Sequence, residues 1–178
     1  MQISGSSAIV VGGAGGLGEA MARRLHAAGA KVVIADLADD KGKELAGKLG
    51  ARYARTDATN TDDVQAAIAE AESAVPLRFS VDAHGGPASG GRLVGKDGTP
   101  LDLDSFKTTI EFYLTGVFNV MRLVAAAMAQ QEPVDGACGV IVNTASIAAY
   151  EGQIGQLPYA AAKGGVVRLH GALRFPPK

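Results

Sequence analysis

Short apolar runs alternate with amphipathic segments along the first half of the chain. Four runs have the length and apolar character of buried strands: Ser6–Val11, Lys31–Ala35, Arg52–Arg55 and Phe79–Ala83. Three segments between them repeat their apolar residues at helical spacing: Gly16–Ala28, Asp39–Leu49 and a segment that begins at a cap on Thr61. Alternation of this kind predicts a parallel sheet with right-handed crossovers and helices on both faces.

The second half of the chain continues this alternation with longer elements. A loop rich in glycine and proline covers residues 85–100, and Asp102 is placed to cap a long helix that ends near Gln130. Gly139–Asn143 predicts a fifth buried strand, and a further helix is expected from about Pro158. The last ten residues are expected to form a tail. The predicted fold class is therefore α/β, a Rossmann-like doubly wound sheet.

Composition and charge limit the classes of function. The chain has room for a single domain, residues 1–178, and 47% of its residues are hydrophobic against 20% charged. A net charge of −1 attracts neither nucleic acid nor an anionic membrane surface, so neither partner is expected. Cys138 is the single cysteine, which excludes an internal disulfide and favours a reducing compartment such as the cytoplasm. Arg122 interrupts the best candidate for a membrane-spanning stretch, so we expect none.

The turn after the first strand carries glycines at a spacing suited to a dinucleotide. Gly12, Gly16 and Gly18 form the pattern G-x-x-x-G-x-G, which is weak evidence alone in a chain with 24 glycines. Its placement between a strand and a helix strengthens it, because the helix start offers free N–H groups to a pyrophosphate. Glycine also lets the phosphate approach the backbone closely. The alternative is a strand–helix turn without a ligand.

Two aspartates follow the next strands and suggest which dinucleotide is bound. Asp36 ends the second strand, where a carboxylate can accept hydrogen bonds from the adenosine ribose hydroxyls. It would repel a 2′-phosphate, and since no Arg or Lys adjoins it, NAD is favoured over NADP. Asp57, after the third strand, is placed to meet the adenine edge. Each aspartate has a plain alternative as an exposed loop residue.

A serine, a tyrosine and a lysine form the candidate catalytic set. Tyr159 and Lys163 are four residues apart and so share one face of the expected helix. Ser146 lies 13 residues before Tyr159, just past the fifth strand. Of the four tyrosines, only Tyr159 has a lysine four residues later, which makes this pattern more specific than the glycines. The alternative is a tyrosine packed on a surface helix.

The chemistry of hydride transfer suits these residue types. Moving a hydride between an alcohol carbon and nicotinamide requires moving the hydroxyl proton as well. The ammonium of Lys163 favours the phenolate of Tyr159, which then acts as base in oxidation and as acid in reduction. Ser146 would hydrogen-bond the substrate oxygen, and Lys163 could also hold the nicotinamide ribose.

These motifs resemble the short-chain dehydrogenase/reductase family. The stretch NTASIAAYEGQIGQLPYAAAKGG, Asn143–Gly165, is similar to its 3-hydroxyacyl-CoA dehydrogenase type-2 branch. The resemblance implies a doubly wound fold, NAD, a secondary alcohol or ketone as the small-molecule substrate (a 3-hydroxyacyl-CoA or a hydroxysteroid), and a homo-oligomer, a dimer or a tetramer. It also implies further cofactor-binding positions beside those above, including Tyr159 and Lys163 themselves. These further positions are Gly15, Leu17, Leu37, Ala58, Ala83, His84 and Gly85.

The sequence departs from the family pattern at four places near the predicted site, including Val11 for the usual Thr and Gly15 for a frequent Ser. Asp82 and His84 stand in VDAHGG, where the family usually has an Asn-Asn-Ala-Gly type of motif. We interpret His84 as a local packing or hydrogen-bonding variant and not as a second catalyst. Tyr113 stands where family members usually carry an Asn thought to anchor a water. Its hydroxyl could substitute for that Asn, or its bulk could disturb the helix there.

The chain is also short for the family. It resembles a member from which several tens of residues were excised between Val167 and Arg168, so that the later strands and the substrate-covering segment are missing. The fifth strand would then be left at a sheet edge, where apolar strands pair with other chains. The Tyr159–Lys163 helix would span about two turns. We expect such a chain to bind substrate poorly, and the alternative function is a catalytically impaired nucleotide-binding or interaction protein.

Overall fold

The computed structural model describes residues 1–86 and 90–169, and the chain packs as two compact units. The first unit comprises residues 1–85 and 119–143. The second unit comprises residues 86–118 and the chain from residue 144 onward. Each unit is described below by itself. The tail predicted for the last ten residues lies, apart from Leu169, outside the described residues.

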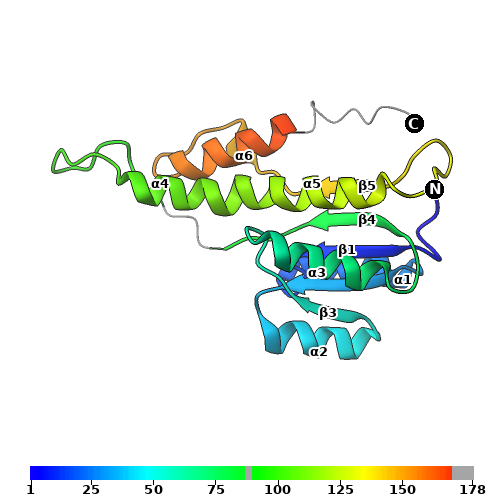
Figure 1. Cartoon of the computed structure of the whole chain (residues 1–178). Helices are drawn as coiled ribbons and strands as arrows, with labels where there is room; N and C mark the ends of the chain where they lie inside the picture. The colour runs from blue at the N-terminus through cyan, green and yellow to red at the C-terminus, as the bar shows by residue number, and fades with distance from the viewer. Residues whose placement is uncertain (87–89, 170–178) are drawn as a thin grey trace. The chain divides into compact units, whose positions relative to one another are not determined.

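The first unit contains one parallel five-stranded sheet. Its strands are β1 (Ser7–Val11), β2 (Lys31–Asp36), β3 (Arg52–Arg55), β4 (Leu77–Asp82) and β5 (Val140–Asn143). Their order across the sheet is β3-β2-β1-β4-β5, and every neighbouring pair is parallel (Figure 1). The order reverses at β1, so the chain winds outward in both directions from the strand that precedes the glycine turn. The predicted doubly wound α/β fold is confirmed.

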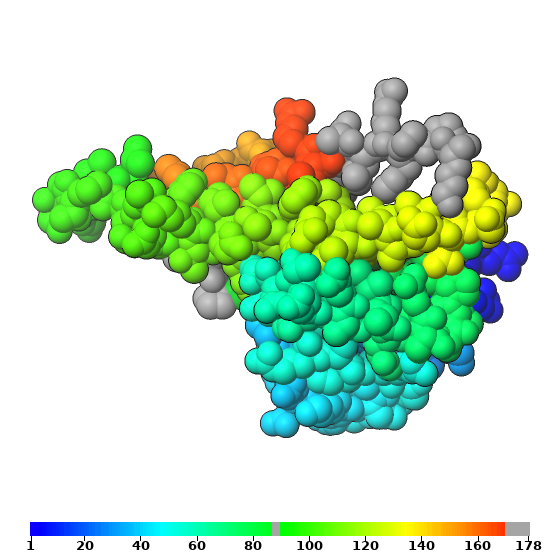
Figure 2. Space-filling model, in the orientation of Figure 1, coloured from blue at the N-terminus to red at the C-terminus, as the bar shows by residue number. Residues whose placement is uncertain are grey.

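Helices cover both faces of this sheet, as the sequence pattern predicts. On one face, α3 (Thr61–Glu72) and α5 (Gly116–Met128) pack against Ile9, Val11 and Val33. On the other face, α1 (Gly16–Ala27) and α2 (Asp39–Leu49) pack against Ala8, Val10 and Ile34. Alternate residues of β1 and β2 therefore enter opposite cores, which explains why both strands are apolar throughout. The outer side of α3, cyan to green, is visible at the surface in Figure 2.

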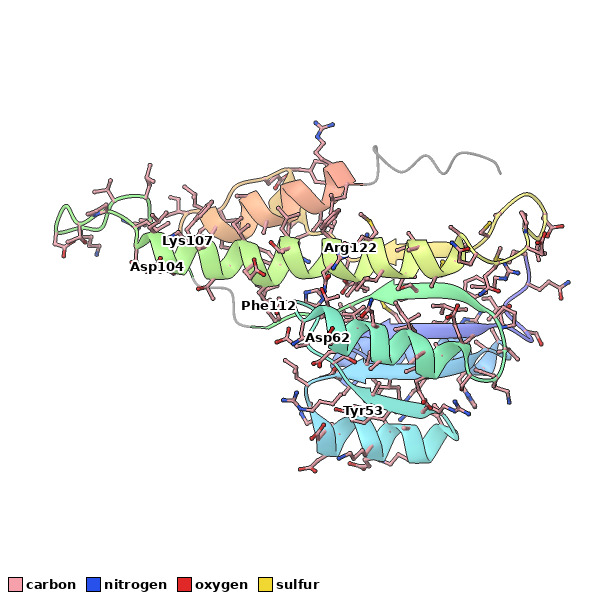
Figure 3. All side chains as sticks on the ribbon, viewed as in Figure 1. Tyr53, Asp62, Asp104, Lys107, Phe112 and Arg122 are labelled. Atoms are coloured by element: carbon pink, nitrogen blue, oxygen red, sulfur yellow. The ribbon has the colours of Figure 1, made fainter. Side chains whose placement is uncertain are left out.

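Helix α3 begins one residue earlier than predicted, because Asn60 and not Thr61 is the cap. The Asn60 side-chain oxygen accepts hydrogen bonds from the backbone N–H groups of Asp62 and Asp63, at 2.9 and 3.2 Å. Thr61 is the first helical residue, and its hydroxyl contacts Asn119 and Arg122 of α5 instead. Arg122, labelled in Figure 3, donates to the Thr61 hydroxyl at 2.8 Å and so links α5 to the start of α3.

The long helix predicted from Asp102 is present but is interrupted by a wider turn. Asp102 caps α4 (Leu103–Ile110), a π-helical segment η1 covers Glu111–Thr115, and α5 completes the run. The π segment contains Tyr113, so the helix is irregular where the sequence predicted a disturbance, while the part of the Tyr113 side chain in causing it stays a prediction.

The helical run 103–128 is long and apolar enough to cross a membrane by length and composition, with a mean hydropathy of 1.3 in its best window. Core helices of globular proteins pass the same test. Val120, Val124 and Met128 lie in the core of the first unit with at most 3% of their surface exposed. We therefore interpret α5 as a core helix.

Strand β5 lies at one edge of the described sheet. Val140 and Val142 are 43% and 48% exposed, so the prediction of a buried fifth strand is wrong, whereas its placement at an edge is confirmed. Their side chains lie on the face that α1 and α2 cover farther along the sheet, since Val140 is in register with Phe79 of the second core. The expectation that this edge pairs with another chain stays a prediction.

The helix that carries the catalytic pair is longer than the two turns expected. It runs over 13 residues as α6 (Leu157–Leu169) and continues past Val167 and Arg168 without a break. Gly165 lets it approach η1 closely, because a Cβ there would lie 2.7 Å from a Leu114 methyl carbon. Gly165 thus permits close packing, and neither Gly164 nor Gly165 ends the helix.

Replacing Asn60 by alanine should lower the free energy of unfolding by about 1 kcal/mol, because two N–H groups at the start of α3 lose their acceptor. Asn60→Ser, which keeps an acceptor of similar reach, should lose much less. Urea unfolding followed by circular dichroism measures both variants. Equal loss in the two variants would show that the side-chain oxygen does not cap the helix.

Candidate active site

The glycine turn follows β1 and is shaped by backbone contacts that exclude side chains. Gly12 has φ +72°, a conformation that favours glycine, and its N–H donates to the Ala35 carbonyl at 2.8 Å. A Cβ on Gly12 would lie within 3 Å of the backbone of Ala83 and His84. A Cβ on Gly18 would collide with the Gly12 carbonyl. These two glycines are therefore required by the fold itself.

Gly15 and Gly16 differ from these two, because space remains around them. Gly15 is the N-cap of α1 and has no side-chain cap, so the N–H groups of the first helical turn stay oriented toward the turn. A Cβ on Gly16 would meet no atom within 4 Å. Leu17 is 66% exposed. The turn thus presents a helix start with open space in front of it, which fits a pyrophosphate.

Asp36 joins the end of β2 to this turn. One carboxylate oxygen accepts from the Ala14 N–H at 2.9 Å and the other from the Ala38 N–H at 2.9 Å. Each oxygen can accept a second hydrogen bond, so the carboxylate remains able to bind ribose hydroxyls. Leu37, the next residue, is 46% exposed. Asp36 therefore has a structural role in addition to the predicted one.

Tyr53 forms hydrogen bonds with the segment Asp36–Asp39 that begins at the end of β2. Its hydroxyl lies 2.8 Å from the Asp36 carbonyl oxygen and 2.7 Å from the Asp39 carboxylate (Figure 3 labels Tyr53). Burial, followed by the hydrogen bond and the negative charge of Asp39, raises the pKa of Tyr53 well above its usual range. Tyr53 is therefore a neutral donor that fixes the chain after β2.

The segment after β3 places Asp57 and Ala58. One Asp57 carboxylate oxygen accepts from the backbone N–H and the hydroxyl of Thr59, at 2.9 and 2.7 Å, which makes a local turn. Ala58 is 8% exposed, and its carbonyl accepts from the Asn119 side chain at 2.8 Å. This local turn agrees with the alternative that Asp57 is a loop residue. The contact between Asp57 and adenine stays a prediction.

The end of β4 brings Ala83, His84 and Gly85 beside the glycine turn. The Ala83 N–H donates to the Val11 carbonyl at 2.8 Å, and the His84 backbone lies against Gly12. The His84 ring nitrogen Nδ1 lies 2.5 Å from the Asp82 carboxylate, and the side chain of Asp82 is 2% exposed. This pairing fits the interpretation of His84 as a local hydrogen-bonding variant. The carboxyl edge of the sheet therefore collects the predicted cofactor positions of the first unit.

The second unit carries the predicted catalytic residues. Lys163 is 3% exposed, and its ammonium donates to the Thr144 carbonyl at 2.7 Å, two residues before Ser146. The same ammonium lies 5.8 Å from the centre of the Tyr159 ring. Ser146 caps the short 3₁₀ helix Ile147–Ala149, which packs against α6. Lys163 thus fixes the segment that holds Ser146 to the helix that holds Tyr159.

Tyr113 also belongs to this cluster, although sequence reasoning did not place it among the site residues. Its ring meets the Tyr159 ring edge to face, with centres 5.0 Å apart, and the Lys163 ammonium lies 5.4 Å from its centre. Its hydroxyl is hydrogen-bonded to the Gly86 backbone. Burial raises the pKa of Tyr113. The available signal was that Tyr113 stands where the family usually carries an Asn, and only the fold shows what Tyr113 contacts.

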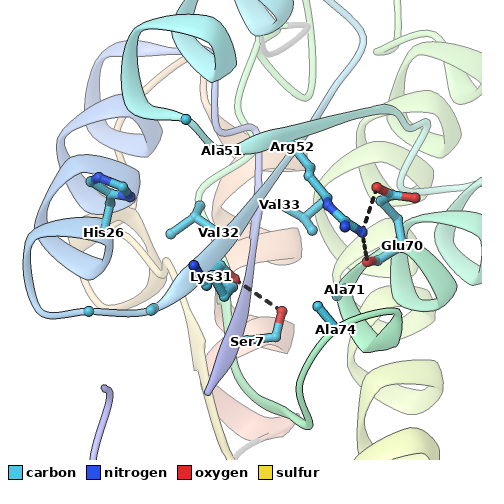
Figure 4. Close-up of a pocket in the computed structure, with 13 residues that line it drawn as sticks. Ser7, His26, Lys31, Val32, Val33, Ala51, Arg52, Glu70, Ala71 and Ala74 are labelled. Atoms are coloured by element: carbon cyan, nitrogen blue, oxygen red, sulfur yellow. Dashed lines mark hydrogen bonds and ion pairs between the residues drawn. The ribbon is translucent and has the colours of Figure 1, made fainter. Parts of the chain in front are cut away.

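One cavity lies away from these residues. It has a volume of about 420 Å³ and is lined at the amino ends of β1, β2 and β3 by Ser7, Lys31 and Arg52 among others (Figure 4). Arg52 is paired with Glu70 at 3.0 Å across its rim. Because doubly wound sheets bind ligands at the carboxyl ends of their strands, we do not assign the cofactor to this cavity.

Metal chemistry has no site among residues 1–86 and 90–169, where no three His, Cys, Asp or Glu side chains are grouped to hold an ion.

Comparison with known proteins agrees with this geometry. A sequence model described as short chain dehydrogenase matches residues 6–176. The Homo sapiens 3-hydroxyacyl-CoA dehydrogenase type-2 is 42% identical over 169 residues, which cover 93% of this chain and 65% of the human protein. The Drosophila melanogaster protein of the same name is 41% identical, covering 93% of this chain and 66% of the relative. The chain thus spans less than two thirds of the length of these relatives.

Solved structures show the same likeness. The crystal structure of 3-hydroxyacyl-CoA dehydrogenase type-2 from Mycobacterium avium superimposes with a TM-score of 0.91 at 56% sequence identity. The match covers 93% of this chain and 66% of that one. A short chain dehydrogenase from Bacillus anthracis gives a TM-score of 0.80 at 23% identity, covering 97% and 68%, and is similar in fold alone.

Replacing Gly18 by alanine and replacing Gly16 by alanine should change the free energy of unfolding differently. Gly18→Ala should lower the free energy of unfolding by about 3 kcal/mol or more, because its Cβ would collide with the rigid Gly12 backbone. Gly16→Ala should be neutral or raise it by up to about 1 kcal/mol, because its Cβ enters open space at a helix position. Denaturant unfolding of the two variants measures this contrast, and similar stabilities would contradict the packing described.

Proposed function

Because this chain belongs to the short-chain dehydrogenase family, we propose that it is an NAD-dependent oxidoreductase acting on a secondary alcohol or ketone. The observation that carries the proposal is the arrangement on α6, where Lys163 is buried beside the Tyr159 ring and bound to the segment that holds Ser146. A buried ammonium next to a phenol has a direct use in proton transfer. Burying a charged group is costly unless it is hydrogen-bonded, and the hydrogen bond from Lys163 to the Thr144 carbonyl offsets part of that cost.

The proposed reaction assigns one role to each of the three residues. Tyr159 takes the hydroxyl proton in oxidation and returns it in reduction, since the positive charge of Lys163 stabilises its phenolate. Ser146 donates a hydrogen bond to the substrate oxygen and stabilises the charge that develops on it. NAD supplies the carbon that accepts or donates the hydride. Lys163 also holds the nicotinamide ribose.

The residues of the first unit fit NAD. The start of α1 faces open space in front of Gly16, which leaves room for a pyrophosphate. The Asp36 carboxylate is held in place by Ala14 and Ala38 and keeps acceptor capacity for two ribose hydroxyls. Its negative charge opposes a 2′-phosphate, which supports NAD over NADP.

The relatives suggest the substrate class. Several similar proteins are named 3-hydroxyacyl-CoA dehydrogenase type-2, and we propose a 3-hydroxyacyl thioester as the substrate of this site, with a hydroxysteroid as the other secondary alcohol to test. We also propose a homo-oligomer, a dimer or a tetramer, working in the cytoplasm. The chain spans 65% of the length of the human relative. The substrate, the oligomeric state and the compartment are therefore proposals for the whole protein, each to be tested by itself.

A second candidate function is binding without chemistry. Tyr113 and the Asp82–His84 pair depart from the family pattern and favour a nucleotide-binding protein of the same fold without turnover. The two functions differ in what the Tyr159 hydroxyl does, since binding of NAD alone does not need it.

Tyr159→Phe should lower the rate of hydride transfer by roughly 100- to 10,000-fold, the usual contribution of a positioned acid–base group, while NAD binding is unchanged. Formation of NADH with a panel of hydroxyacyl-CoAs and secondary alcohols measures the rate, and calorimetry measures binding. Tyr150→Phe is the matched control, because Tyr150 is 73% exposed. Binding of NAD without turnover that depends on Tyr159 would support the second function instead.

Gly16→Ala should weaken NAD binding roughly tenfold, because its Cβ would occupy the space in front of the helix start. Gly47→Ala in α2 is the control, since its Cβ also meets open space and lies far along the chain from the turn. Calorimetry with NAD measures both variants. Equal affinities in the two variants and the parent chain would remove the glycine turn from the proposed site.

A further inference from the structure

We propose that Tyr113 is a positioning residue of this site, whose ring fixes the Tyr159–Lys163 pair and whose hydroxyl fastens the chain at Gly86. The inference rests on the proposed function for its meaning in catalysis, but the contacts themselves are testable without turnover. All four residues belong to the second unit.

The position of Tyr113 in the helix directs its side chain toward α6. It lies in the π-helical segment η1, where the wider turn changes the direction in which side chains leave the backbone. Its surface is 3% exposed, so the whole ring is packed. The close approach of α6 to η1 at Gly165 brings Tyr159 and Lys163 within reach of that ring.

The ring of Tyr113 makes two contacts with the proposed catalytic pair. It meets Tyr159 at an interplanar angle of 85° with centres 5.0 Å apart, an arrangement that aromatic rings favour and that limits rotation of both. The Lys163 ammonium lies 5.4 Å from the centre of Tyr113 and 5.8 Å from that of Tyr159, near both rings. Two aromatic rings and the Thr144 carbonyl thus surround a buried positive charge.

The charge state of Tyr113 is compatible with this role. Burial raises its pKa, so the phenol stays neutral where Tyr159 is required to ionise. A second phenolate beside Tyr159 would repel the first one. Tyr113 therefore acts through Tyr159 and Lys163 and does not itself take the substrate proton.

The hydroxyl of Tyr113 binds the backbone of Gly86 in both directions. It accepts from the Gly86 N–H at 3.0 Å and donates to the Gly86 carbonyl. Gly86 is exposed, so protection of its N–H from exchange with water depends on this hydrogen bond. Gly86 directly follows Gly85, a predicted cofactor position, so the same hydroxyl restrains the end of that segment.

The test compares Tyr113→Phe, which removes the hydroxyl and keeps the ring, with Tyr113→Leu, which removes both. Tyr150→Phe is the matched control, because it removes an exposed tyrosine hydroxyl of the same unit. Amide hydrogen exchange reports on Gly86, and the NMR shifts of the Tyr159 ring, which respond to a neighbouring aromatic ring, report on the packing.

Tyr113→Phe should speed exchange at Gly86 by roughly three- to tenfold, the effect of losing one hydrogen bond, and leave the Tyr159 shifts unchanged. Tyr113→Leu should speed exchange and also move the Tyr159 shifts. Tyr150→Phe should do neither. Unchanged exchange at Gly86 in Tyr113→Phe would overturn the proposal, and so would Tyr159 shifts that move as far in the Phe variant as in the Leu variant. If Tyr113→Leu fails to fold, the exchange rate of the Gly86 N–H in Tyr113→Phe alone tests the proposal.

Kinetics separates this inference from the proposed function. In a protein that turns over, Tyr113→Phe should raise KM for NAD while kcat stays close to that of the parent, and Tyr113→Leu should lower kcat as well. A parent chain that neither binds NAD nor turns over would contradict the proposed function, whereas the exchange and NMR results would still decide the role of Tyr113.

Discussion

Backbone packing around Gly12 is the constraint on which the first unit depends. Three segments meet there without a side chain between them: the end of β1, the start of α1 and the end of β4. Gly12 supplies the left-handed turn, and Gly18 lets the helix lie on the Gly12 carbonyl. Since no side chain caps the start of α1, the geometry that closes the fold also leaves the first N–H groups of α1 available to the proposed phosphate.

In the second unit, the buried Lys163 is the residue on which the arrangement of the neighbouring segments depends. Lys163 is removed from water at a cost that its contacts must offset, and they do so by holding several elements together. Its ammonium binds the Thr144 carbonyl ahead of Ser146, while Tyr113 and Tyr159 present aromatic rings to it. The charge that favours proton transfer in the proposed function therefore also organises the segments around it.

Local sequence predicted much of this, and its errors have physical reasons. The bounds of β3 and α2 match the pattern, because a Gly50 with φ +63° ends α2 and the runs are short and distinct. The cap of α3 was misplaced by one residue, since Asn60 and Thr61 are both good caps and only the backbone path selects between them. The length of α6 was underestimated because the apparent excision after Val167 suggested an end there, whereas the helix continues to Leu169.

The sequence alone determined the α/β class, the glycine turn, Asp36 and the Ser146, Tyr159 and Lys163 set, because each depends on local spacing and residue chemistry. Only the tertiary structure showed that the valines of β5 are exposed, that Asp82 pairs with His84 and that Tyr113 packs against Tyr159. Those features depend on contacts between residues distant in the chain. Tyr113 and Tyr159 are 46 positions apart, and no periodic pattern connects them until the helices pack.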